Sequence, residues 1–341
     1  YTRITHRRIM SLNIDFSGDQ QEENDQGVSP KAMGGTELSR KWLFDRLDPE
    51  LRDYFQFISS RKRKLEDKPR LFWVHDLAQD PEVAFLKEKS NAMLDFEKIL
   101  FVSHWQQYQY GVYLGVPYDH GVTIQHAIDP IPEHKKPEDK ITCIYFSTPH
   151  RGLEVLLESW RLMKENLKSE AVDKAELKVF SSFEIYDRPH MDEQFRHVYK
   201  KAQDMDQVHY SGSVSNDVIR EELQKTHILA YPSTYMETAC ICAIEAMSAK
   251  QLVVCPNLGA LPETCANFSF MYGYEPSPDR HVQVHAHILA RAINSYGDTG
   301  TQALLDLQKG YFDMFYDWRT RLNQWTAFLT SLKENIEAAK K

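Results

Sequence analysis

The 341-residue chain has 41 Lys and Arg against 49 Asp and Glu, and its formal net charge of −8 argues against a general nucleic-acid binder. Its 42% hydrophobic and 26% charged residues are ordinary for a soluble enzyme, and the length suffices for two domains. No apolar run approaches the roughly 18 residues of a membrane span and no secretory signal is found. We therefore expect a cytoplasmic protein, which is able to contact a membrane peripherally.

The first predicted strand is Ile9–Phe16, and a long polar segment follows it. Two glycines, Gly34 and Gly35, then precede an amphipathic helix that Thr36 is expected to cap and that ends at Asp48. Glycines between a strand and a helix let the backbone approach a diphosphate closely, so both are candidate donor-binding residues. A simple turn is the alternative interpretation.

Three buried strands are predicted next, at 55–59, 70–74 and 99–103. His75 follows the second of them, so it lies at the carboxyl end of a strand, where open α/β sheets bind ligands. His75 is therefore expected to face the ligand crevice, and a structural histidine is the alternative. Pro130, Pro132 and Pro137 mark a linker, so we expect a first domain at 1–130 and a second at 131–315.

The second domain is expected to begin with a strand at 142–146, followed by Arg151 and Gly152 at the start of a helix. A guanidinium at that place can hold diphosphate oxygens in a bidentate way, and a surface arginine is the alternative. Further strands are predicted at 177–180 and 208–210, and the loop after the latter ends at Val214.

The most informative stretch is Tyr231–Thr264. A short apolar run at 227–230 enters it and a second at 252–255 lies within it, and both are predicted to be buried strands. A polar loop and a helix predicted at 240–249 connect these strands, as in a right-handed βαβ unit. Glu237 lies in the loop and Glu245 about two turns into the helix. The backbone N–H groups of Thr238, Ala239 and Cys240 would face a phosphate at the helix N-terminus. The alternative is a helix-capping charge at 237 and a solvated helical residue at 245.

Glu237 and the run Glu245-Ala246-Met247, followed by Gly259-Ala260-Leu261-Pro262-Glu263, resemble the nucleotide-sugar site of retaining family-four glycosyltransferases. The chain departs from the common pattern after Glu237, where many members carry Phe-Gly, and at Lys250, where many carry Gly. The resemblance implies an α/β protein with the GT-B fold, in which two Rossmann-like domains face each other across a cleft.

The resemblance also implies a role for each candidate. Glu237, His75 and Arg151 would form the catalytic group, with Glu237 on the sugar and Arg151 on the diphosphate. Donor binding would further involve Glu245 on the ribose and Val214 beside the base. The donor-binding set is Gly34, Gly35, Arg151, Val214, Thr238, Ala239, Cys240 and Glu245. For Val214, simple loop packing is the alternative.

The C-terminal stretch, Tyr311–Lys341, is predicted to be helical with an aromatic stripe that packs in a core. The resemblance implies that its last helix, 316–341, returns to the first domain. Asp204-Met205-Asp206 has the form of a metal motif but precedes a predicted strand, so we interpret it as solvated charge. Cys240-x-Cys242 lacks partners for zinc. We expect no metal and no other cofactor.

The sequence thus predicts a retaining glycosyltransferase that moves a sugar from a nucleotide-diphosphate-sugar donor to a hydroxyl group. The acceptor would be a glycan, a glycolipid or another hydroxyl compound. A non-catalytic nucleotide-sugar-binding protein of the same fold is one alternative, and a GT-B epimerase or phosphorylase is another. A phosphorylase would be expected to bind pyridoxal phosphate through a lysine, for which the sequence has no motif.

Overall fold

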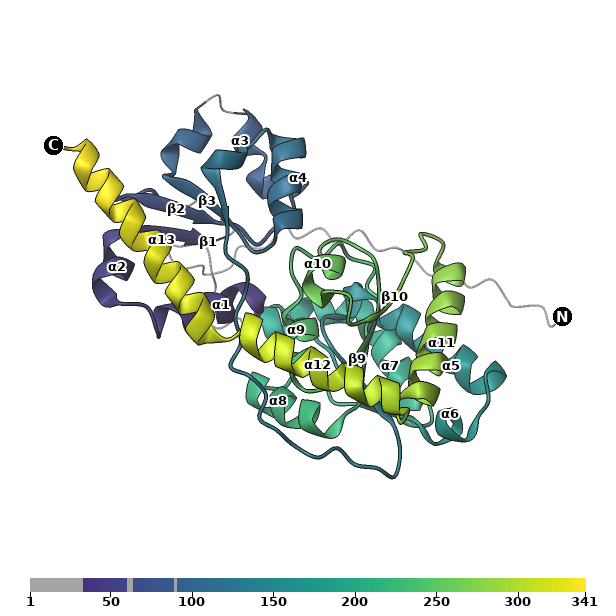
Figure 1. The fold of residues 1–341 in the computed structure, drawn as a ribbon. Helices are drawn as coiled ribbons and strands as arrows, with labels where there is room; N and C mark the ends of the chain where they lie inside the picture. Colours follow the sequence, from purple (N-terminus) through teal and green to yellow (C-terminus); the bar gives the residue numbers. More distant parts are fainter. Residues whose placement is uncertain (1–32, 60–63, 89–90) are drawn as a thin grey trace.

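The computed structural model describes residues 33–59, 64–88 and 91–341. Within these ranges the chain forms two parallel sheets, each in its own α/β domain, and the two domains lie side by side (Figure 1). The α/β class and the GT-B arrangement predicted from the sequence are confirmed. The strand predicted at Ile9–Phe16 lies outside the described residues.

The first domain is built on a four-stranded sheet in the order β1-β2-β3-β4, with every neighbouring pair parallel. Apolar side chains of β1, β2 and β3 are buried, as expected for a sheet covered on both faces. The strands are β1 (Gln56–Ser59), β2 (Arg70–Trp73), β3 (Lys98–Phe101) and β4 (Gly121–Thr123), and the helices are α1 (Gly35–Phe44), α2 (Pro49–Tyr54), α3 (Phe85–Glu88) and α4 (His104–Leu114).

Two details at the ends of α1 differ from the prediction. The helix begins at Gly35 with Gly34 as its N-cap, so Thr36 lies inside the first turn and is not the cap. The helix ends at Phe44, and Asp48 instead caps α2, where its side chain accepts hydrogen bonds from the backbone of Glu50 and Leu51. A carboxylate followed by Pro at the first helical position is a helix start, so the prediction that the first helix runs to Asp48 is wrong.

The second domain contains a six-stranded parallel sheet in the order β7-β6-β5-β8-β9-β10. Numbered along the domain this is the order 3-2-1-4-5-6 of a Rossmann sheet. The strands are β5 (Thr142–Phe146), β6 (Glu176–Phe180), β7 (Val208–Tyr210), β8 (Ile228–Ala230), β9 (Leu252–Pro256) and β10 (Phe270–Tyr272). The helices of this domain are α5 (Leu153–Asn166), α6 (Glu170–Lys174), α7 (Arg196–Asp204), α8 (Asn216–Lys225), α9 (Ile241–Ser248), α10 (Leu261–Cys265), α11 (Pro278–Ser295) and α12 (Thr299–Phe315). The last helix, α13 (Trp318–Ala339), packs against the core of the first domain.

The strand order reverses between β5 and β8, which are neighbours in the sheet although about 80 residues of sequence separate them. The loops that follow these two strands therefore diverge from a common crevice at the carboxyl ends of the sheet. In open α/β sheets this switch point is where ligands bind. Arg151 follows β5 and Glu237 follows β8, so the topology brings both candidates to the same crevice.

The predicted aromatic stripe of the C-terminal stretch is split between the two domains, because the helix breaks at Tyr316 and Asp317. Phe312 in α12 belongs to the core of the second domain. Trp325 in α13 belongs to the core of the first, where its ring centroid lies 5.0 Å from that of Trp73. Figure 1 shows α13 along the first domain and α12 along the second. Asp317 caps α13, and the carbonyl of Tyr316 accepts a hydrogen bond from Ile128 in the linker.

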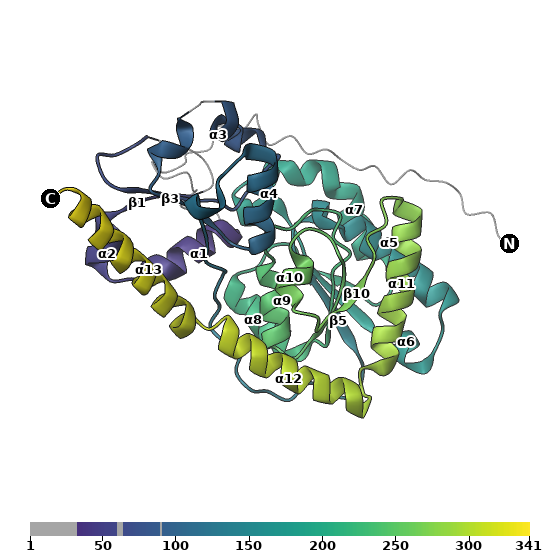
Figure 2. The ribbon, with the colours of Figure 1, turned by 45° about the horizontal axis from the view of Figure 1, so that its top comes forward.

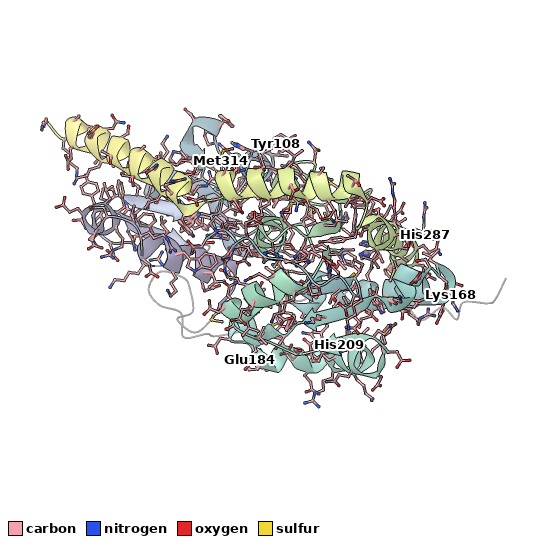
Figure 3. The ribbon with its side chains drawn as sticks, turned by 60° about the horizontal axis from the view of Figure 1, so that its bottom comes forward. Tyr108, Lys168, Glu184, His209, His287 and Met314 are labelled. Carbon is pink, nitrogen blue, oxygen red and sulfur yellow. The ribbon has the colours of Figure 1, made fainter. Side chains whose placement is uncertain are left out.

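Lys168, His209 and His287 are exposed on the outer surface of the second domain, and so is the apolar side chain of Met314 on α12 (Figure 3). Among the described residues, no helix combines the length and apolar character needed to cross a membrane. The five cysteines of the chain are free thiols.

Candidate active site

A cavity lies between the two domains, above the switch point of the second sheet. Every candidate site residue predicted from the sequence lines it. The first domain contributes the start of α1 and two histidines, His75 and His126. The second domain contributes the loops after β5, β6, β7 and β8 and the start of α9. The structure thus brings together residues that are up to about 210 positions apart in the sequence.

The centre of the cavity is a buried ion pair between Arg151 and Glu237. The Arg151 side chain is 19% exposed and that of Glu237 is 4% exposed. Glu237 also accepts a hydrogen bond of 2.6 Å from the Tyr231 hydroxyl, and the Arg151 guanidinium lies 4.6 Å from the centroid of the Tyr235 ring. Burial opposes the charge of Arg151, but Glu237 and the neighbouring tyrosine oxygens outweigh it and raise the pKa of Arg151. The Arg151 guanidinium therefore stays charged in the cavity.

Gly152 allows the two loops that carry this pair to touch. Its φ is +112°, a backbone conformation that favours glycine, and an added Cβ would lie 2.1 Å from the carbonyl oxygen of Pro232. No other residue fits there without moving one of the loops. The Arg-Gly dipeptide therefore carries two functions, with the arginine supplying the charge and the glycine the close approach.

A second buried carboxylate lies beside the first, on α9. Glu245 is 2% exposed, and its Oε1 accepts a hydrogen bond of 3.1 Å from Arg220 of α8, while Asn216 Nδ2 lies 3.5 Å from both carboxylate oxygens. Burial raises the pKa of Glu245, and Arg220 and Asn216 act in the opposite direction. Glu245 is not a solvated helical residue, which was the alternative considered from the sequence.

Arg220 and Asn216 were missed by the sequence reasoning. Arg220 also donates hydrogen bonds to the carbonyls of Asp129 and Pro130, at 2.7 and 3.3 Å, so it ties the linker to the cavity wall. The two residues are four positions apart on α8 and therefore share a helix face. The spacing of four predicts that the two side chains lie together on one face of the helix, but nothing in the sequence indicates that this face contacts Glu245.

The turn after Glu237 is attached to the first domain. Thr238 Oγ1 donates a hydrogen bond of 2.8 Å to the carbonyl of His75, and the Thr238 carbonyl accepts one of 2.6 Å from Ser103 Oγ. Ala239 packs against the core of the first domain, and Cys240 is the N-cap of α9. The turn that departs from the family pattern is thus the place where the two domains meet at the cavity.

Two histidines of the first domain stack beside this turn. The ring centroids of His75 and His126 are 5.6 Å apart with an interplanar angle of 23°, and His126 Nδ1 lies 2.9 Å from Ser39 Oγ. Burial, with smaller effects of His126 and Arg40, holds the pKa of His75 well below its usual range. Burial also lowers the pKa of His126 to about 4. Both rings are therefore neutral at pH 7, and His126 is a cavity residue that sequence reasoning did not single out.

The remaining candidates form the rim of the cavity. Gly34 lies against Tyr186 of the second domain, and an added Cβ would approach the Tyr186 ring to 2.4 Å. The backbone N–H of Met33 donates to the carbonyl of Ile185 at 2.7 Å, which holds the two domains together at this edge. Gly35 lies beside α9, and Val214 lies on the wall formed by the loops after β6 and β7.

Four cavity residues carry a buried polar atom that has no hydrogen-bond partner among the described residues. These atoms are His75 Nε2, Thr148 Oγ1, Arg151 Nε and Ser181 Oγ. Buried polar groups are nearly always paired in folded proteins, so such a group of unpaired atoms in one cavity indicates a polar ligand. In the described part of the chain, no cluster of three or more His, Cys, Asp or Glu side chains is arranged to hold a metal ion.

Comparison with known proteins supports this interpretation. Residues 126–290 match the family described as glycosyl transferases group 1. A glycosyltransferase from Rickettsia africae ESF-5 is 15% identical with a TM-score of 0.62, over 82% of this chain and 77% of that one. Anabaena Alr3699/HepE in complex with UDP-glucose is 15% identical with a TM-score of 0.56, over 77% and 72% of the two chains. A sucrose-phosphate synthase from Thermosynechococcus elongatus is 12% identical with a TM-score of 0.61, over 79% and 69%. A comparison with curated proteins gives no match.

The two parallel-sheet domains, the cavity between them and these structural similarities establish the GT-B fold for this chain. Its second domain, within residues 126–290, is a group 1 glycosyltransferase domain. The resemblance to glycosyltransferases that was inferred from Glu237, Glu245 and the loop ending at Glu263 is therefore confirmed.

Proposed function

We propose that the protein transfers a sugar from a nucleotide-diphosphate-sugar donor to a hydroxyl group, with retention of the anomeric configuration and without a metal ion. The observation that carries the proposal is the buried pair of Arg151 and Glu237, which lies among unpaired polar atoms at the switch point of the second sheet. Anabaena Alr3699/HepE, a protein of similar fold, has been crystallised with UDP-glucose. A uridine diphosphate sugar is accordingly the first donor to test.

Arg151 is the group that would bind the diphosphate. A guanidinium has five N–H donors, and Glu237 accepts a hydrogen bond from only one of its nitrogens, Nη1. The unpaired Nε of Arg151 and the N-terminus of α9 would then meet the phosphate oxygens as negative charge develops on the leaving group. Fixed positive charge and aligned dipoles at that point stabilise the transition state without any rearrangement. They also take the place that a metal ion has in other enzymes.

Glu237 would position the sugar ring. Its carboxylate accepts hydrogen bonds from Arg151 and Tyr231, and these fix its orientation. The remaining lone pairs of the carboxylate can accept hydrogen bonds from sugar hydroxyls. His75 would contribute a neutral imidazole to the same sugar, since its Nε2 is buried and unpaired. Glu245, which Arg220 holds in place, would accept hydrogen bonds from the ribose hydroxyls. Val214 would lie against the base.

The acceptor would enter from the first domain, where the Gly34-Gly35 turn borders the cavity. We infer a hydroxyl acceptor such as a glycan or glycolipid, and a cytoplasmic enzyme that is able to contact a membrane peripherally. The nucleotide sugar would be a substrate, and the protein would need no cofactor.

A thermal-shift screen against nucleotide sugars tests the proposal. A ligand at about 100 times its dissociation constant stabilises the folded protein by about 2.7 kcal/mol, which a melting curve resolves easily. We expect stabilisation by one nucleotide sugar and by its free nucleotide, and a smaller shift in Glu245→Gln. If no nucleotide sugar of the panel shifts the melting temperature, the cavity is not a donor site.

A further inference from the structure

A second contact between the domains lies outside the cavity, at the N-terminus of α4. The carboxylate of Glu263, on α10 of the second domain, accepts hydrogen bonds from the backbone N–H groups of His104 and Trp105, at 3.0 and 2.9 Å. It also accepts one of 2.9 Å from the side-chain amide of Gln125. All three donors belong to the first domain. Figure 2 shows α4 standing over α10 at the boundary between the domains.

The N-terminus of α4 requires such an acceptor. The first N–H groups of a helix have no partner within it, and the helix dipole favours a negative charge there. The first turn of α4 contains no acidic residue of its own, and its cap Ser103 satisfies only the N–H of Gln106. Glu263 therefore supplies from the second domain the charge and the acceptors that the first domain lacks.

The same loop of the second domain is attached to the turn that carries Glu237. The N–H of Ala260 donates a hydrogen bond of 2.7 Å to the carbonyl of Glu237. Gly259 has a φ of +62°, and an added Cβ would lie 2.5 Å from that same carbonyl oxygen, so the two loops are packed backbone against backbone. A displacement of Glu263 from α4 would therefore also displace the backbone of Glu237.

We propose that Glu263 is a positioning residue for sugar transfer, which closes the two domains on α4 and thereby sets the position of the Glu237 turn. This inference rests on the proposed function for its kinetic consequence, but the closure itself is independent of the reaction. Glu263 contacts neither the cavity nor any candidate catalytic side chain in the described structure. Its effect would pass through the helix N-terminus and the Ala260 hydrogen bond.

The first test replaces Glu263 with Gln, which keeps the shape but loses the charge and one acceptor. Glu337→Gln is the matched control, because Glu337 is an exposed residue on α13. We expect Glu263→Gln to lower kcat about tenfold, to leave the UDP dissociation constant within about twofold, and to raise the radius of gyration measured by small-angle scattering. The control should match the wild type in all three. Wild-type values of kcat and radius of gyration in Glu263→Gln would overturn the proposal.

The second test removes a donor on the other side of the contact. His104→Pro deletes one of the two N–H donors at the first helical position, where proline is tolerated and the extended backbone of Ser103 suits a following proline. We expect this variant to change kcat and the radius of gyration in the same direction, and the double variant to lose little more than Glu263→Gln alone. Additive losses would show that the two groups act independently and would overturn the proposal. Scattering needs no activity, so an inactive wild type would refute the proposed function and not the closure.

Discussion

Replacing Arg151 with Met is expected to destabilise the protein, because it leaves the Glu237 carboxylate buried without its counter-ion. Glu237 is 4% exposed, and the Tyr231 hydroxyl would be its remaining donor in the cavity. Removing one partner of a buried ion pair costs about 3–5 kcal/mol. Because Tyr231 still donates and Arg151 is 19% exposed, we expect a loss near the lower limit, about 3 kcal/mol. For a domain of this size that corresponds to a melting temperature lower by about 6–12 °C.

The measurement is a double-mutant cycle by thermal unfolding, with Arg151→Met, Glu237→Gln and the two combined. The double variant removes both charges, so it should be more stable than the sum of the single losses predicts, by at least about 1 kcal/mol. Nucleotide binding should be weakened in both variants that lack the arginine, since an uncharged side chain cannot hold the diphosphate. If the losses of the two single variants simply add, Arg151 and Glu237 are not a coupled pair and the description of the cavity centre is wrong.

Three further predictions follow from the same contacts. Glu245→Gln should weaken the binding of free nucleotide and of nucleotide sugar alike, as measured by calorimetry, whereas Glu237→Gln should lower turnover more than nucleotide affinity. Equal effects of the two substitutions would refute the separate roles of the two glutamates. Activity should survive excess EDTA, and a loss that manganese or magnesium restores would contradict the metal-free mechanism. His126, with a folded pKa of about 4 against about 6.5 when unfolded, contributes stability that is present above pH 6.5 and lost as the pH falls toward 4. His126→Asn should therefore flatten the acid side of the stability curve by about 1 kcal/mol per pH unit near pH 5, and an unchanged slope would show that the ring is not buried as a neutral group.

Local pattern was sufficient to predict most strands of the two sheets and the class of the fold. Buried parallel strands are short continuous apolar runs, and those at 142–146, 228–230 and 252–256 lie within a residue or two of their predicted bounds. The helix of the βαβ unit was equally clear, because its apolar residues recur at helical spacing. β4 (Gly121–Thr123) and β10 (Phe270–Tyr272) were not predicted, because these edge strands are only partly buried and neither forms a continuous buried apolar run.

The pairing of side chains within the site could not be predicted. Arg151 and Glu237 are 86 positions apart, and their contact depends on the order of the strands, which no local pattern reveals. The contacts of Glu263 could not be predicted either, because the resemblance identifies this residue only as the end of a motif and does not say what it binds. Its partners are backbone N–H groups of another domain, and the sequence does not indicate such donors because almost every residue has one.

The C-terminal helices illustrate a further limit. Phe312 and Trp325 belong to one apolar pattern in the sequence but to two different cores in the structure. The apolar periodicity of a helix shows that one of its faces is buried, but it does not show which domain that face packs against. The break at Tyr316 and Asp317 was the usable signal, because an Asp before a helical run is a common N-cap.

Hydrolysis of the donor in the absence of acceptor tests the central claim most directly. The wild-type protein is incubated with the nucleotide sugar that gives the largest thermal shift, and the released sugar is followed by proton NMR before its anomers equilibrate. We predict release of the free nucleotide together with a sugar of the same anomeric configuration as the donor, and no release by Glu237→Gln. A product of opposite configuration would contradict the retaining mechanism, and an intact donor with both proteins would contradict a donor site at Arg151 and Glu237.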